Sequence, residues 1–339
     1  MAEKILKVDN LKTSFYTHVG EVKAIRGVSF DLEAGGTLGI VGESGSGKSV
    51  TSLSIMRLLQ YPGKIINGDV TFKGENLLTK SKNEMRHIRG NEISMIFQDP
   101  MTSLNPLMKV GEQIMESMIL HQKISRKEAK VKTVEMLELV GIPSPAERVD
   151  QFPHEFSGGM RQRAMIAMAL ACEPTVLIAD EPTTALDVTI QAQILDLMKG
   201  LNEKMGMAIV LITHDLGVVA DVCDRVLVMY GGLIMEEGSV SDIFYRPSHP
   251  YTVGLLNSIA TGDSDERLVP IVGTPPDLLA PPAGCPFFAR CDHAMEVCRN
   301  NQPEHFVMGE GHRSACWLLH EDAPKVNFRK GVKGVVTGE

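Results

Sequence analysis

The sequence predicts an α/β fold with a parallel sheet, a helical insertion and a smaller C-terminal appendix. Strand-length apolar runs alternate with segments of helical periodicity, an order typical of a parallel sheet. The chain has 339 residues, of which 43% are hydrophobic and 22% charged, so it can fold as one large domain with a small addition. After Pro247 the composition shifts to proline-rich stretches, which mark the start of the appendix.

The individual elements follow from short patterns in chain order. Alternating and continuous apolar runs predict the strands, and apolar residues at helical spacing predict the helices between them. Strands are expected at 5–8, 28–32, 38–41, 93–97, 176–179, 208–213, 225–229 and 233–235, and helices at 49–59, 160–172, from 188 onward and at 240–245.

The segment between Asn105 and Phe156 predicts the helical insertion. Ser125 with Glu128 forms a capping-box pattern at the start of a helix, and Gly141 stands where that helix would end in a left-handed turn. The apolar face expected for this helix consists of Val131, Val134, Leu137 and Val140.

Composition also argues against several classes of protein. No apolar run reaches the 18 or more residues of a membrane-spanning helix, and residues 1–12 lack the apolar stretch of a signal peptide, so a cytosolic location is expected. The formal net charge of -8 argues against a nucleic-acid partner, because binding to phosphate backbones requires a basic face.

The strongest local pattern is the run from Gly42 to Ser49, which matches G-x-x-x-x-G-K-[ST] between a predicted strand and a predicted helix. Its glycines let backbone N–H groups surround phosphate oxygens at a helix N-terminus. Lys48 would neutralise the β and γ oxygens, and the Ser49 hydroxyl would ligate Mg²⁺. The pattern predicts a P-loop that binds a nucleoside triphosphate.

Two acids end the apolar strand 176–179. Asp180 is placed to orient Mg²⁺ through water, and Glu181 is placed to polarise an attacking water as general base. Solvated acids at a strand end are common by themselves, but beside a P-loop they indicate hydrolysis.

A second phosphate-binding helix start is predicted at 156–163, where Ser157, Gly158 and Gly159 precede a basic helix. One active site needs only one such cradle. A second is useful if it closes over nucleotide held by another subunit.

Together these segments resemble the nucleotide-binding subunits of ABC transporters. Their signature L-S-G-G-Q is kept here except that Phe156 replaces the leucine and Met160 the glutamine. The resemblance implies a P-loop ABC ATPase domain over residues 1–250, with a mixed sheet, a RecA-like core and a helical subdomain at about 99–160.

The resemblance also implies roles for individual residues. Gln98 would ligate Mg²⁺ and sense the membrane partner, Asp187 in the segment 185–187 would communicate across a dimer, and His214 would hold the γ-phosphate. Either Phe15 or Tyr16 would stack on adenine. The implied ATP-binding residues are Phe15, Tyr16, Gly42, Ser44, Gly45, Ser46, Gly47, Lys48, Ser49, Val50, Ser157, Gly158, Gly159, Asp180 and Asp187; the Mg²⁺ ligands are Ser49, Gln98 and Asp180; the catalytic residues are Gln98, Glu181 and His214.

Segments 97–106, 187–193 and 246–252 resemble the dipeptide and oligopeptide importer ATPases more particularly. This implies a peptide-importer C-terminal region at 251–320 and a polar tail at 321–339. The protein would lie at the cytoplasmic face of the membrane, paired with a second, identical or paralogous ATPase subunit, two permease subunits and, indirectly, an extracellular substrate-binding protein. The alternatives are an importer of another solute such as nickel, a soluble ABC ATPase acting on nucleic acid, and a regulatory ATP-binding protein without turnover, which the presence of Glu181 disfavours.

Four cysteines, Cys285, Cys291, Cys298 and Cys316, crowd into this C-terminal region, which we expect to lie outside the main core. Their spacing, C-x5-C-x6-C-x17-C, names no metal by itself, but so short a segment has little core of its own and thiolates could staple it. The resemblance implies a [4Fe-4S] cluster. Zinc, with one of His293, His305 and His312, and four reduced cysteines without metal are the alternatives, whereas Cys172 and Cys223 are expected in the core.

Overall fold

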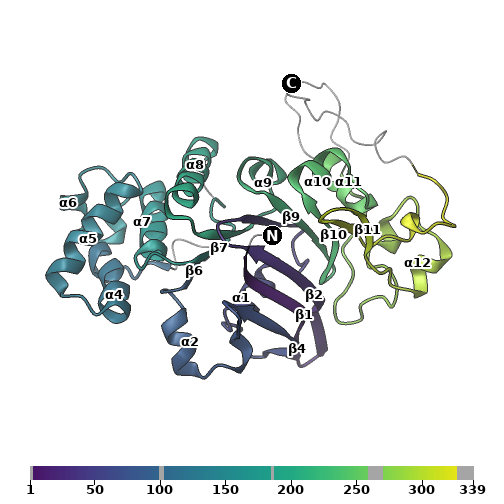
Figure 1. Ribbon diagram of the computed structural model, residues 1–339, viewed down its shortest axis with the longest axis horizontal. Helices are drawn as coiled ribbons and strands as arrows, with labels where there is room; N and C mark the ends of the chain where they lie inside the picture. The colour runs from purple at the N-terminus through teal and green to yellow at the C-terminus, as the bar shows by residue number, and fades with distance from the viewer. Residues whose placement is uncertain (1–2, 99–102, 185–186, 259–269, 327–339) are drawn as a thin grey trace. The chain divides into compact units, whose positions relative to one another are not determined.

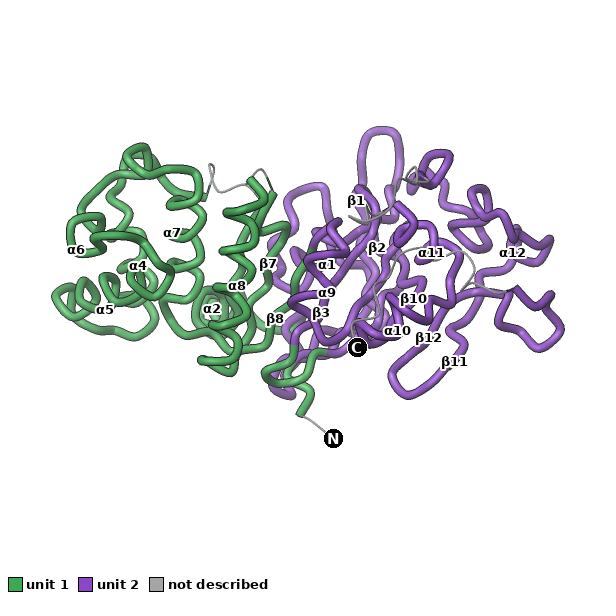
Figure 2. Tube along the Cα trace, turned by 90° about the horizontal axis from the view of Figure 1, so that it is seen from above, with its two compact units in different colours: residues 1–5, 32–36, 79–212 green, residues 6–31, 37–78, 213–339 purple. Residues whose placement is uncertain are grey.

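The computed structural model describes residues 3–98, 103–184, 187–258 and 270–326, and it divides into two compact units (Figure 2). Unit 1 consists of residues 1–5, 32–36 and 79–212, and unit 2 of residues 6–31, 37–78 and 213–339. Within the described residues, no helix combines the length and the apolar character needed to span a membrane. Short 3₁₀ turns lie at Leu77–Thr79 (η1), Pro153–Glu155 (η2), Phe288–Arg290 (η3) and Trp317–Leu319 (η4).

Unit 1 contains three parallel strands, β6 (Ile93–Ile96), β7 (Val176–Asp180) and β8 (Ala208–Ile212), with β7 between the other two. Every residue of β7 and β8 is buried, as expected for parallel strands covered on both faces. The helices α7 (Gly158–Leu170) and α8 (Val188–Met205) follow the predicted positions. These elements confirm the strand–helix alternation expected from the sequence.

The helical part of unit 1 comprises α2 (Lys82–Ile88), α4 (Val110–Gln122), α5 (Arg126–Leu139) and α6 (Pro145–Arg148). In Figure 1, α4, α5 and α6 lie together with α7. The side chain of Ser125 accepts a 3.2 Å hydrogen bond from the Glu128 N–H and caps α5, which is one of the two hydrogen bonds of the predicted capping box. Gly141, at a φ of 74°, makes the predicted left-handed turn.

The predicted apolar face of α5 is wrong in part. Val131 is 55% exposed, and the residues that α5 and its C-terminal end bury are Ala129, Thr133, Leu137 and Val140. An α-helix turns 100° per residue, so three-residue steps drift around the helix and cannot stay on one face over nine residues.

Unit 2 begins with an antiparallel sheet in the order β2-β1-β4-β5. The predicted strands 5–8 and 28–32 lie inside the longer strands β1 (Lys4–Thr17) and β2 (Gly20–Glu33). The strands β4 (Gly63–Phe72) and β5 (Glu75–Asn76) were not predicted, because few of the β4 side chains are buried and the segment shows little apolar alternation.

Unit 2 also contains the strand β3 (Thr37–Val41), which pairs in parallel with β9 (Arg225–Tyr230). β9 continues antiparallel into β10 (Leu233–Ser239). The helices are α1 (Lys48–Ile55), which ends earlier than predicted, α9 (Leu216–Val222), α10 (Val240–Tyr245), α11 (Pro250–Asn257) and α12 (Glu296–Asn300).

The C-terminal region is joined to the core of unit 2, contrary to the expectation that it lies outside. A hairpin of β11 (Phe306–Gly309) and β12 (His312–Ser314) adds to the antiparallel edge of β10, pairing Glu236 with Ser314. The Lys23 N–H also donates a 2.9 Å hydrogen bond to the Leu278 carbonyl. The sequence analysis missed these two strands because they are only four and three residues long, which is too short to show an alternating pattern.

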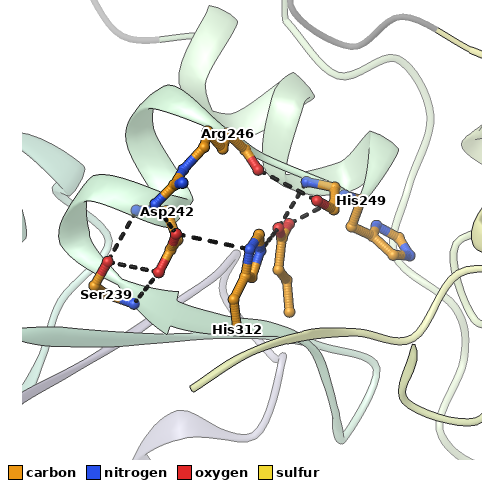
Figure 3. A network of polar contacts seen from close by, with 7 residues as sticks. Ser239, Asp242, Arg246, His249 and His312 are labelled. Carbon is orange, nitrogen blue, oxygen red and sulfur yellow. Dashed lines mark hydrogen bonds and ion pairs between the residues drawn. The ribbon is translucent and has the colours of Figure 1, made fainter. Parts of the chain in front are cut away.

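A buried polar network fastens this hairpin to β10 and α10 (Figure 3). The fully buried Glu236 carboxylate accepts hydrogen bonds from the backbone N–H of Ser248 (2.6 Å) and of His249 (3.1 Å), and it lies 2.9 Å from the His312 ring nitrogen Nε2. The other ring nitrogen of His312 lies 3.8 Å from the Asp242 carboxylate. His312 thus sits between two carboxylates, one on β10 and one on α10.

Candidate functional site

The loop between β3 and α1 has the backbone of a phosphate cradle. Gly42, Gly45 and Gly47 have φ angles of 148°, 77° and 105°, which side chains rarely allow. A Cβ atom at Gly42 would stand 2.1 Å from the Met229 carbonyl oxygen, so glycine is required there for space as well. The predicted P-loop therefore has the conformation that its glycines require.

Lys48 opens α1 and points back into the loop. Its buried ammonium donates hydrogen bonds to the carbonyl oxygens of Gly42 (2.7 Å) and Glu43 (3.0 Å). The Ser46 hydroxyl is also buried, without a hydrogen-bond partner among the described residues. A buried ammonium and a buried hydroxyl in a glycine-rich loop at the start of a helix suit a bound polyanion.

The acids at the end of β7 lie where the sequence predicts. Asp180 is buried in register with Ile212 of β8. Glu181 follows in a left-handed conformation (φ 47°), which costs a non-glycine residue about 1 kcal/mol or more and is typical of functional sites.

Two donors orient the Glu181 carboxylate. Its Oε2 atom accepts hydrogen bonds from the Gln98 side-chain amide (2.9 Å) and from the Thr184 hydroxyl (2.8 Å). Within unit 1 the structure thus brings together Gln98 and Glu181, which are 83 residues apart in the sequence. Thr184 was missed by the sequence reasoning, since a hydroxyl three residues after an acid is no signal by itself.

The second predicted cradle opens α7. The exposed Ser157 caps this helix by accepting a 3.3 Å hydrogen bond from the Met160 N–H, and Gly158 has open space where a side chain would stand. The buried Gln162 amide donates to the Pro182 carbonyl, which ties α7 to the turn after Glu181. Gln162 is a further residue that sequence reasoning missed.

His214 is exposed in the loop after β8, and Asp187 is the exposed N-cap of α8, where it accepts a 3.0 Å hydrogen bond from the Ile190 N–H. The other two residues of the predicted segment 185–187 lie outside the described residues. A helix start with an acidic cap explains Asp187 structurally and leaves its role across a dimer a prediction.

The two aromatic candidates for adenine stacking differ in their surroundings. The half-buried Phe15 ring is packed so closely on Gly63 that a Cβ there would lie 2.8 Å from it. Tyr16 is 45% exposed, and the Lys64 ammonium lies 5.5 Å from its ring centroid. Since a stacking ring must present an open face, the geometry favours Tyr16.

The four C-terminal cysteines are free thiols. Burial raises the pKa of Cys285 and of Cys316 to about 12 and that of Cys291 to about 11, while N–H groups near each sulfur act in the opposite direction. Among the described residues, no group of three or more His, Cys, Asp or Glu side chains is arranged to hold a metal ion. The arrangement itself thus gives the expected [4Fe-4S] cluster no support.

Comparisons with known proteins find matches for both the N-terminal and the C-terminal part of the chain. A family profile described as ABC transporter matches residues 25–184, and one described as oligopeptide/dipeptide transporter, C-terminal region, matches residues 235–298. The chain is similar to the oligopeptide transport ATP-binding protein OppD of Bacillus subtilis, at 59% identity over 97% of this chain and 93% of that protein. It is also similar to the dipeptide transport ATP-binding protein DppD of the same organism, at 57% identity over 95% and 96%.

Solved structures give the same fold. The dimeric, post-hydrolysis structure of the ATP-binding cassette MJ0796 bound to ADP and phosphate has a TM-score of 0.63 and 28% identity, and the match covers 69% of this chain and 98% of that one. The mixed sheet with helices described above is therefore the fold of these cassettes.

Proposed function

This chain belongs to the ABC transporter family as an ATP-binding subunit, and we propose that it hydrolyses ATP to energise the uptake of dipeptides or oligopeptides across the cytoplasmic membrane. The observation that carries the proposal is the similarity to peptide-transport ATP-binding proteins over nearly the whole chain. The match of the C-terminal region to a peptide-transporter family supports this substrate class. We place the protein at the cytoplasmic face of the membrane, bound to two permease subunits that receive peptide from a binding protein.

The proposed chemistry assigns a task to each residue of these motifs. Backbone N–H groups of the loop at 42–50 and the Lys48 ammonium would hold the phosphates, with Tyr16 against the adenine. The Glu181 carboxylate, oriented by Gln98 and Thr184, would accept a proton from the attacking water. His214 would hold the γ-phosphate.

Ser49, Gln98 and Asp180 are proposed to hold Mg²⁺. A hydroxyl, an amide oxygen and a carboxylate are the hard oxygen donors that this ion prefers, and the burial of Asp180 at the end of β7 fits a ligand rather than a solvated acid. Bound there, Mg²⁺ would neutralise charge on the β and γ phosphate oxygens.

Two copies or paralogues of the subunit are proposed to share each site. The exposed Ser157 and Gly158 and the half-buried Gly159 at the start of α7 would contact nucleotide held by the partner subunit, and Asp187 would communicate across the dimer. The open surroundings of Gly158 support this, because a cradle that serves another chain must stand free of its own.

Replacing Glu181 by Gln tests the hydrolytic role. The amide keeps the shape of the side chain but is a far weaker proton acceptor, so we expect ATP binding to persist while turnover falls at least about a hundredfold. The measurement is ATP affinity and phosphate release, with Glu203→Gln on the exposed face of α8 as the matched control. Normal turnover in Glu181→Gln, or equal loss in the control, contradicts the assignment.

Peptide uptake tests the substrate class. Cells lacking their own peptide-importer ATPase subunits should take up labelled di- or oligopeptide when supplied with this chain and its permease partners, and should lose that uptake with Glu181→Gln. Uptake of nickel ion but of no peptide would overturn the proposed cargo and leave the ATPase assignment standing.

The [4Fe-4S] cluster is proposed for Cys285, Cys291, Cys298 and Cys316 on the chemistry of the donor set. Four thiols in one segment are a complete ligand set, and backbone N–H groups of Phe287, His293 and Leu318 near the sulfurs are of the kind that tunes such clusters. Cys285→Ser should then lower iron and sulfide content in anaerobically purified protein, whereas Cys223→Ser, a buried control, should not. Wild-type protein with zinc or no metal would refute the cluster.

A further inference from the structure

The C-terminal region contacts the P-loop through one arginine, Arg290. The Arg290 guanidinium makes two parallel hydrogen bonds with the Glu43 carboxylate, from Nη1 to Oε2 at 2.6 Å and from Nη2 to Oε1 at 2.9 Å. Glu43 is the second residue of the P-loop, 247 residues earlier in the chain. Both residues belong to unit 2, so the pair lies within one compact body.

Arg290 uses all five of its N–H donors. Besides the two bonds to Glu43, Nη1 donates to the Tyr230 hydroxyl (3.0 Å), Nη2 to the Ile271 carbonyl (3.0 Å) and Nε to the Val272 carbonyl (3.0 Å). Its side chain is only 5% exposed. A lysine has three donors in a different geometry and cannot replace this arrangement.

A second contact fixes the backbone of the same P-loop residue. The Glu43 N–H donates a 2.8 Å hydrogen bond to the hydroxyl of Tyr251, a residue of α11. The rings of Tyr230, Tyr251 and Phe287 pack against one another with centroids 4.6 to 5.4 Å apart, and Arg290 lies over two of them. The anchor is therefore rigid on the side of the C-terminal region.

The anchored residue also contributes to the nucleotide cradle. The Glu43 carbonyl accepts a hydrogen bond from Lys48 and another from the Ser46 N–H at 3.2 Å. A hydrogen bond from the Gly232 N–H to the Ser46 carbonyl (3.0 Å) holds the next part of the loop. Fixing Glu43 thus fixes the path of the loop that would surround the phosphates.

We propose that Arg290 is a positioning residue for nucleotide binding, through which the C-terminal region preorganises the P-loop. The bidentate bond holds Glu43, and with it the loop carbonyls and N–H groups, in the conformation that accepts phosphate. Loss of this bond leaves a loop that must be ordered when ATP binds, so affinity falls while the groups that carry out hydrolysis stay intact. The inference rests on the ATP-binding role proposed above.

The test compares two arginines of the same region. Arg290→Lys keeps the positive charge but loses the fork, and Arg313→Lys makes the same change at an arginine that binds Glu237 and the Ser29 carbonyl and does not contact the P-loop. Affinity for ATP and ADP is measured by titration calorimetry, and kcat and KM by phosphate release. We expect Arg290→Lys to weaken nucleotide binding about tenfold, the loss typical of a charged hydrogen bond, with kcat changed less than threefold and Arg313→Lys near wild type.

A double-substitution cycle connects the effect to Glu43. Glu43→Gln should weaken nucleotide binding to a similar extent. The variant with both Glu43→Gln and Arg290→Lys should bind nucleotide no more weakly than the single variant with the lower affinity, because the two residues form one interaction. Additive losses in the double variant would contradict coupling through this pair.

Each remaining outcome has a defined meaning. Unchanged nucleotide affinity in a folded Arg290→Lys protein, or an equal loss in Arg313→Lys, overturns the positioning role. Failure of the wild-type protein to bind ATP at all would instead overturn the proposed function, so the two failures are distinguishable.

Discussion

His249 makes the stability of this protein sensitive to acid, and its replacement by Asn should remove that sensitivity. The side chain is 1% exposed at the start of α11, where Nδ1 accepts a 3.0 Å hydrogen bond from the Tyr251 N–H. Burial lowers the pKa of His249 from 6.5 to about 3. Asn at this position can accept the same capping hydrogen bond but has no proton to gain.

The magnitude follows from the two pKa values. The folded protein takes up this proton only near pH 3, whereas the unfolded chain takes it up near pH 6.5, so the stability is lost progressively as the pH falls through this range. At pH 5, protonation of His249 in the unfolded chain raises the equilibrium constant of unfolding by a factor of about 30, which lowers the free energy of unfolding by about 2 kcal/mol. At pH 7 the same effect is close to zero.

The assay is urea unfolding of the wild type and of His249→Asn at pH 7 and pH 5. The free energy of unfolding should fall by about 2 kcal/mol more in the wild type than in the variant, and subtraction removes the contribution of the other histidines. Equal losses in the two proteins would show that His249 is not held neutral by burial and would refute the reasoning.

One further substitution tests the polar network around Glu236, and another tests the space around Gly42 in the P-loop. Glu236→Ala removes the acceptor of two buried backbone N–H groups and of His312, so it should lower the free energy of unfolding by about 3 to 5 kcal/mol in chemical denaturation, and Glu236→Gln should lose less. Gly42→Ala places a Cβ 2.1 Å from the Met229 carbonyl and should abolish nucleotide binding in a calorimetric titration, whereas Gly74→Ala, at a left-handed glycine with open space, should bind normally. Binding by Gly42→Ala, or stability in Glu236→Ala, would contradict the geometry described.

The sequence predicts the parts of the site that lie within short segments. The P-loop from Gly42 to Ser49, the acids at the end of β7 and the capped start of α7 are each fixed by neighbouring residues, because backbone conformation and helix ends depend on local chemistry. The same locality explains the correct parallel strands of unit 1, whose buried runs are unmistakable.

Contacts between distant segments could not be predicted in this way. Arg290 and Glu43 are 247 positions apart in the sequence, and His312 and Glu236 are 76 positions apart. In the sequence alone, an isolated arginine or histidine looks like an ordinary surface residue. The predicted apolar face of α5 was wrong in part for another reason. Its exposed Val131 is apolar, and apolar residues at the surface are common enough to mislead a periodicity.

The pairing of the P-loop with Arg290 sets an order of events during protein synthesis. A chain grows from its N-terminus at about 5 to 20 residues per second, so the ribosome completes Glu43 on the order of ten to fifty seconds before Arg290. During most of that interval β3 lacks its sheet partner β9, and the loop after β3 lacks the support of Arg290. If Arg290 positions the P-loop as proposed, a chain cut short before this residue would keep the ATP-binding motifs but lack the contact with Glu43, so premature termination would yield a fragment that binds nucleotide weakly.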